Sequence, residues 1–172
     1  MSRKISTAAI GAAVSLLFIV LSRFVPSMKL TFTVLATVGT IIPMSRGYVR
    51  ESALASIAVI ILGAIIVQTS VIPYVLLGSF YTILTIWAKR KGIKIFITLP
   101  LKVLYAALVF YVVYTLTGLL VIDLDKLTFF DGLSETAIFF VLDAVFIVAF
   151  LVFDFIVLEL YEYIGKRLEK LS

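Results

Sequence analysis

The chain has 172 residues, of which 63% are hydrophobic and 15% charged, and its formal net charge is +5. Its mean hydropathy of +1.21 exceeds what a water-soluble domain of this size can bury, so the composition predicts a polytopic membrane protein. Because it has no Cys and no His, we expect no disulfide, thiol chemistry, imidazole base, metal site or cofactor. The basic residues stand in small groups between apolar runs, which argues against nucleic-acid binding.

The apolar runs predict six membrane crossings in chain order. The first, at about residues 5–24, follows Arg3 and Lys4 and has the length of about 20 residues that a retained membrane helix needs. A shorter second run covers about 30–44. No charged residue occurs from 53 to 88, which predicts two crossings joined by a turn near residues 68–73. The fifth lies within 95–122 and the sixth at about 136–161, so the predicted fold is all-α, one six-helix transmembrane domain over 1–172.

The basic residues also predict the orientation, because cytoplasmic loops carry an excess of Lys and Arg. With both termini in the cytoplasm, eleven basic residues fall inside and three outside. The inner set is Arg3, Lys4, Arg46, Arg50, Lys89, Arg90, Lys91, Lys94, Lys166, Arg167 and Lys170, and the outer set is Arg23, Lys29 and Lys126. The last outer loop is acidic and contains Asp123, Asp125, Asp131 and Glu135.

The first predicted helix contains a run of small residues, "STAAIGAAVS". Ala8 with Ala12, and Ala9 with Ala13, form small-xxx-small pairs, and in a bilayer such pairs allow helices to approach closely. The stripe packs either against another helix of the same chain or against a partner subunit.

The segment "KISTAAIGAAVSLLFIVLSRF" resembles the first helix of the substrate-binding S-components of energy-coupling-factor (ECF) vitamin transporters. In that family a basic residue is followed by an Ala-xxx-Ala motif that docks onto a membrane scaffold subunit, which is coupled to two ATPase subunits. The resemblance implies a six-helix protein of a prokaryotic cell membrane that captures a vitamin or similar small solute, with Ala8, Ala9, Ala12 and Ala13 at the partner interface. It favours the partner subunit as the neighbour of the stripe.

A non-transport alternative remains open. The membrane proteins of the bacterial rod-shape morphogenesis complex share the six helices and the size, and the "RGYVRE" turn is weakly similar to theirs. An enzyme is not expected, because the chain has no phosphate-binding glycine loop of the Walker type and Lys102 has no Ser within one helical turn.

Four polar side chains stand inside the predicted spans: Gln68, Lys102, Asp143 and Asp154. Each is costly in hydrocarbon unless it is paired or reaches water. Lys102 and Asp154 are expected near the same membrane surface, where they can form a structural ion pair. Asp143 belongs to the outer half, where we weigh a solute-binding role against a hydrogen bond to a neighbouring Tyr or Thr.

Tyrosines on the fourth and fifth helices suggest a ring-lined solute pocket, although Tyr74 and Trp87 can instead belong to an aromatic belt at the membrane interface. In the family that the first helix resembles, the site opens outward and is built from the outer parts of helices four to six. That topology implies a substrate-binding set, with the segment "RFVPSMK" as its gate. The set is Gln68, Tyr74, Tyr81, Tyr111, Tyr114, Phe139 and Asp143.

Overall fold

A computed structural model describes residues 2–117 and 134–169, and every regular element in these ranges is helical. Among the predicted features of the last outer loop, Asp123, Asp125, Lys126 and Asp131 lie outside the described residues. Glu135, which was expected in that loop, is the first residue of the last helix.

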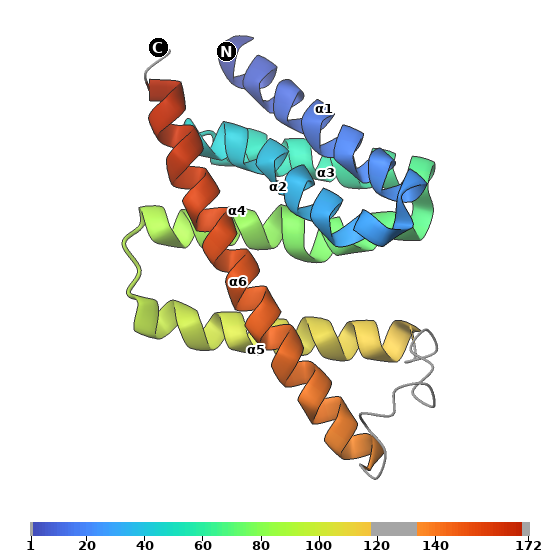
Figure 1. Ribbon diagram of the computed structural model, residues 1–172. Coiled ribbons are helices and arrows are strands. Elements are labelled where there is room, and N and C mark those ends of the chain that lie inside the picture. The colour runs from blue at the N-terminus through green and yellow to red at the C-terminus, as the bar shows by residue number, and fades with distance from the viewer. Residues whose placement is uncertain (1, 118–133, 170–172) are drawn as a thin grey trace. The chain divides into compact units, whose positions relative to one another are not determined.

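Within residues 2–117 and 134–169, six α-helices follow one another (Figure 1). They are α1 (Ser2–Phe24), α2 (Lys29–Ser45), α3 (Val49–Val67), α4 (Phe80–Arg90), α5 (Ile95–Thr117) and α6 (Glu135–Glu169). A 3-10 helix, η1 (Pro26–Met28), lies between α1 and α2. A second 3-10 helix, η2 (Gln68–Val71), and a π-helix, η3 (Tyr74–Ser79), lie between α3 and α4.

Four of the described helices are long and apolar enough to cross a membrane, namely α1, α3, α5 and α6. This fits the prediction of a polytopic membrane protein. The predicted second crossing corresponds to α2, which is a shorter apolar helix. The predicted fourth crossing begins after a break at η2 and consists of η3 followed directly by α4. This break between α3 and η3 lies at the position of the turn that was predicted near residues 68–73.

The chain divides into two compact units, and α6 contributes to both. Unit 1 comprises Met1–Gly92 and Asp154–Ser172, and unit 2 comprises Ile93–Phe153. The expectation of a single domain stays a prediction, and each unit is described by itself below.

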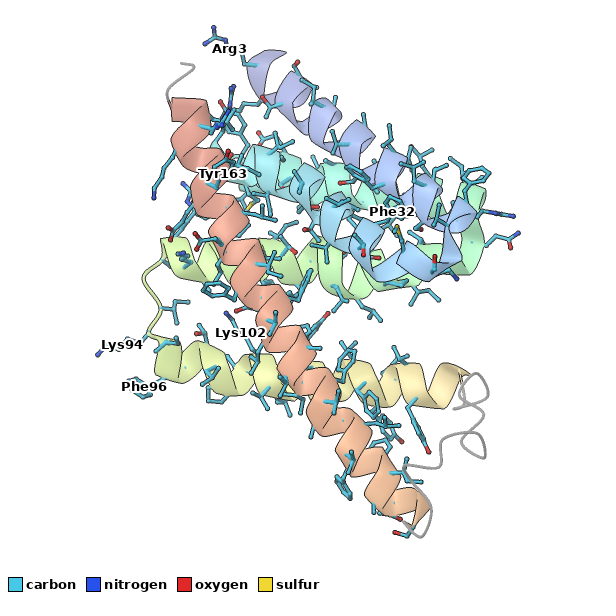
Figure 2. All side chains as sticks on the ribbon, viewed as in Figure 1. Arg3, Phe32, Lys94, Phe96, Lys102 and Tyr163 are labelled. Atoms are coloured by element: carbon cyan, nitrogen blue, oxygen red, sulfur yellow. The ribbon has the colours of Figure 1, made fainter. Side chains whose placement is uncertain are left out.

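In unit 1, α1 packs against α2 and α3 (Figure 1). The backbones of α1 and α2 approach each other closely at two glycines: a Cβ atom on Gly11 would lie 2.3 Å from the carbonyl oxygen of Gly39. Ser15, one turn further along α1, donates a 2.7 Å hydrogen bond to the carbonyl oxygen of Ala36. Toward the other end of α1, Phe18 stacks on Phe32, which Figure 2 labels on α2. Small side chains thus bring the two backbones together, as expected for helices in lipid.

The core of unit 1 lies beside this crossing. Its buried residues are Ile19, Ala36, Val59, Val67, Val71 and Tyr74. Hydroxyl groups line the same region: Ser52 donates to the carbonyl oxygen of Thr40, and the side chain of Thr40 bonds the hydroxyl of Tyr74. Because buried polar groups are costly without partners, these bonds make the polar residues compatible with an apolar core.

Unit 2 consists of α5 and the first part of α6, through Phe153. Large apolar side chains of α5 are exposed, for example Phe96 and Leu104, and Figure 2 shows Phe96 pointing away from its helix near Lys94. Such exposure is normal for a helix whose outer surface contacts lipid, because lipid tails are as apolar as these side chains.

Candidate functional site

An aromatic cluster joins α5 and α6 in unit 2. We call Phe110, Tyr114, Phe139 and Phe146 the ring cluster. Phe110 of α5 contacts Phe139 and Phe146 of α6, with ring centroids 5.4 and 5.6 Å apart. Tyr114 meets Phe139 edge to face at 4.8 Å. Two residues of the predicted solute site, Tyr114 and Phe139, are therefore in direct contact.

Asp143 lies on α6 between Phe139 and Phe146, whose rings contact Phe110. It follows Phe139 by four residues and precedes Phe146 by three, so the three side chains share one face of the helix. Its Oδ1 atom is shielded from solvent, and no residue within the described ranges forms a hydrogen bond with it. Oδ1 therefore does not make the hydrogen bond to a neighbouring Tyr or Thr within the described residues, and the role of Asp143 stays a prediction.

This arrangement has the chemistry of a small-molecule site. A carboxylate oxygen accepts hydrogen bonds and attracts positive charge, while aromatic faces and edges stack on flat apolar groups. A ligand with a hydroxyl, amide or amine donor attached to a planar ring would satisfy both features. An ionisable residue inside a membrane helix is also more often functional than accidental, because its burial is costly.

Tyr74, another predicted solute ligand, lies in the core of unit 1. Its side chain is only 1% exposed, and its hydroxyl lies 2.9 Å from the Thr40 side-chain oxygen and 3.5 Å from that of Ser15. Trp87, by contrast, is exposed, and the aromatic-belt alternative stays a prediction for both residues. The solute-binding role of Tyr74 stays a prediction.

Tyr81 and Asp154 form a buried hydrogen bond in unit 1. The Tyr81 hydroxyl donates to Asp154 Oδ1 at 2.6 Å, and both side chains are buried. Tyr81 was predicted as a solute ligand and Asp154 as the ionic partner of Lys102. Lys102 belongs to unit 2, so that ion pair stays a prediction, while the bond to Tyr81 gives Asp154 a partner that the sequence did not indicate.

The remaining predicted solute ligands, Gln68 and Tyr111, are exposed. Gln68 directly follows α3 as the first residue of η2 and has a φ of 51°, a region that residues other than glycine rarely adopt. Tyr111 is on α5, one residue after Phe110 of the ring cluster. Their roles also stay predictions.

The stripe of small residues on α1 separates into two faces. Ala8 is buried and Ala12 half-buried, and Ala12 packs against the core of unit 1. Ala9 and Ala13 are exposed on the other side. Packing within the chain therefore uses Ala8, Gly11 and Ser15 and leaves the Ala9–Ala13 pair uncovered within the described residues.

Several residues that contribute to these sites were not identified from the sequence. Gly39 of α2 completes the crossing with α1, Thr40 bonds Tyr74 and Ser52 in the core of unit 1, and Phe110 and Phe146 complete the ring cluster. The spacing of Phe139, Asp143 and Phe146 on one helical face was the available signal for the ring cluster. For Gly39, no feature of the local sequence indicates which helix it approaches.

Comparisons of the chain with protein-family models, curated proteins and solved structures gave no match.

Proposed function

We propose that this chain is the membrane-embedded substrate-capture subunit of an ECF-type, ATP-driven uptake transporter for a vitamin or a similar small solute. The observation that carries the proposal is the shielded Asp143 oxygen without a hydrogen-bond partner, placed between Phe139 and Phe146. Leaving such an oxygen unsatisfied costs about 1–3 kcal/mol. A solute that donates a hydrogen bond to it recovers that free energy.

The exposed Ala9–Ala13 pair supports the second half of the proposal, which is docking to a membrane scaffold subunit coupled to paired ATPases. The pair lies on the first helix behind Arg3 and Lys4, as in the family that this helix resembles. Its small side chains leave a smooth helix surface that a partner helix can approach closely. The chain itself supplies neither a nucleotide site nor a catalytic residue in this proposal.

The proposal includes six crossings with both termini in the cytoplasm. Two of the six are short. The fourth combines η3 and α4, which together have 17 residues, Tyr74–Arg90, and the second is α2, also with 17 residues. At 1.5 Å per residue, 17 residues extend about 25 Å, and a bilayer accommodates this length by local thinning.

Solute capture is tested by mass spectrometry of the small molecules that co-purify with the protein in mild detergent. We expect a bound solute in the unmodified protein and roughly tenfold loss of occupancy in Asp143→Asn, because the charged acceptor is replaced by a neutral amide oxygen that accepts a weaker hydrogen bond. When both proteins are compared free of solute, their unfolding temperatures should be equal, since Asp143 Oδ1 has no hydrogen-bond partner to lose within the described residues. Glu159→Gln removes an exposed carboxylate of the same helix and should retain the solute.

Two results would contradict solute capture. The first is a protein that carries no small molecule and binds none when incubated with candidate vitamins. The second is an Asp143→Asn variant that unfolds at lower temperature yet retains its solute, which would make Asp143 structural.

Partner docking is tested by replacing Ala13 with Trp. If this face meets a scaffold subunit, the isolated variant should keep its thermal stability and bound solute, while co-purification with coupling subunits and uptake are lost. Unfolding of the isolated variant would instead indicate that Ala13 packs within the chain. A variant that keeps every property would remove the partner interface from this face and favour the scaffold alternative.

A further inference from the structure

A cavity lies in unit 1, at the end of α4 that the basic residues assign to the cytoplasmic side. It has a volume of about 320 Å³ and is lined by Gly47, Val49, Trp87, Arg90 and Lys91. Gly47 and Val49 come from the turn between α2 and α3 and the start of α3, and the other three come from the end of α4. The cavity thus forms where two turns on one side of the unit meet.

Gly47 leaves room for the side chain of Arg90, one of the two cations that line the cavity. Its φ of +82° is a backbone conformation that residues with side chains rarely adopt. A Cβ atom at this position would lie 3.1 and 3.3 Å from the two terminal guanidinium nitrogens of Arg90. Glycine therefore permits both the turn and the position of the Arg90 side chain over it.

The cavity is lined by two cations, Arg90 and Lys91. Lys89, which precedes Arg90, forms an ion pair with Glu162. No carboxylate within the described ranges forms an ion pair with Arg90 or Lys91. Two more cations, Arg46 and Arg50, flank the turn that contains Gly47. A site of this composition favours an anion, and the planar guanidinium of Arg90 suits the oxygens of a phosphate group.

An exposed apolar strip leads along α4 to the same cavity. Phe80, Leu84 and Trp87 are spaced four and three residues apart, and Lys91 follows four residues later, so all four lie on one face of the helix. The three apolar side chains are exposed. A ligand that fits both features has a negatively charged head and an apolar tail.

We propose that this cavity binds the phosphate headgroup of an anionic membrane phospholipid, with an acyl chain along Phe80 and Leu84. Free phosphate shares the headgroup chemistry but leaves the apolar strip unused. The lining of the cavity includes a tryptophan, a residue type that is enriched at membrane interfaces. It also includes two cations, which attract anionic lipids.

Trp87 makes the test specific, because it is the only tryptophan of the chain and lines the cavity. The protein is reconstituted into phosphatidylcholine vesicles in which a fixed minor fraction is either brominated phosphatidylglycerol or brominated phosphatidylcholine. Bromine quenches tryptophan fluorescence on contact. We expect the anionic lipid to quench Trp87 several-fold more effectively, since each nearby cation favours it about fivefold.

The Arg90→Gln/Lys91→Gln variant should lose this preference. The matched control, Lys94→Gln/Lys166→Gln, removes two exposed cations outside the cavity and should keep it. Equal quenching by both lipids in the unmodified protein would overturn the proposal, and so would an equal loss of preference in both variants. Inorganic phosphate is added to the detergent-purified protein as a separate arm. A saturable change in Trp87 fluorescence there, without preference for the anionic lipid in vesicles, would assign the cavity to free phosphate.

Discussion

At the scale of single residues, the polar side chains of the helices are satisfied mainly by nearby backbone. Thr7 donates to the carbonyl oxygen of Arg3, Ser22 to that of Ile19 and Thr33 to that of Lys29. These are bonds to the preceding turn of the same helix, which hydroxyl side chains make readily. Polar side chains that bond to another helix, or that have no hydrogen-bond partner within the described residues, therefore tell more about packing and function.

The hydrogen bond from Tyr81 to Asp154 connects α4 and α6, and its contribution to stability can be predicted. Tyr81→Phe removes the donor from a buried carboxylate oxygen while keeping the ring. Because hydrogen bonds to charged groups contribute about 1.5–3 kcal/mol, we expect a clear fall in the thermal unfolding temperature in detergent.

The control is Tyr163→Phe, which also removes one hydroxyl but from an exposed tyrosine, and it should unfold like the unmodified protein. Combining Tyr81→Phe with Asp154→Asn should cost less than the sum of the single changes. Fully additive losses would mean that the two groups do not interact.

At the scale of helices, the crossing of α1 and α2 depends on the absence of side chains. A Cβ atom on Gly39 would lie 2.2 Å from both the carbonyl oxygen of Gly11 and the hydroxyl oxygen of Ser15. Gly39→Ala therefore forces the helices apart and should destabilise the protein by about 1–3 kcal/mol, measured as a lower unfolding temperature.

Gly165→Ala provides the matched control within α6. A Cβ atom at Gly165 meets nothing within 4 Å, and alanine has the higher helix propensity by about 1 kcal/mol. This variant should be neutral or slightly more stable. If Gly39→Ala is also neutral or more stable, α1 and α2 do not approach each other closely at Gly39.

At the scale of the whole molecule, the eleven-to-three distribution of basic residues predicts an orientation with both termini in the cytoplasm. The chain contains no cysteine, so single cysteines can be labelled without background. Ser27→Cys, between α1 and α2, should react with a membrane-impermeant thiol reagent in intact cells. Lys94→Cys, at the start of α5, should react only after the cells are permeabilised. Labelling of Lys94→Cys in intact cells to the same extent would reverse or break the predicted topology.

Much of the helical structure was accessible from the sequence alone. Long apolar runs must be helical in lipid, where every backbone polar group needs an internal partner, and the described parts of the six predicted runs are helical. The break near Gln68 followed from polar residues and a proline inside a long uncharged run. Asp143 and Asp154 could be singled out because carboxylates are costly in hydrocarbon.

Only the tertiary structure decided which surfaces meet. Lipid and protein interior are equally apolar, so hydrophobic periodicity does not mark the inner face of a membrane helix. For that reason the sequence could not divide the stripe on α1 into an inner face with Gly11 and an exposed pair, Ala9 and Ala13. Pairing between distant residues was equally hidden: Tyr81 bonds Asp154 across 73 positions, and the room that Gly47 leaves for Arg90 depends on two turns that are close in space but far apart in the chain.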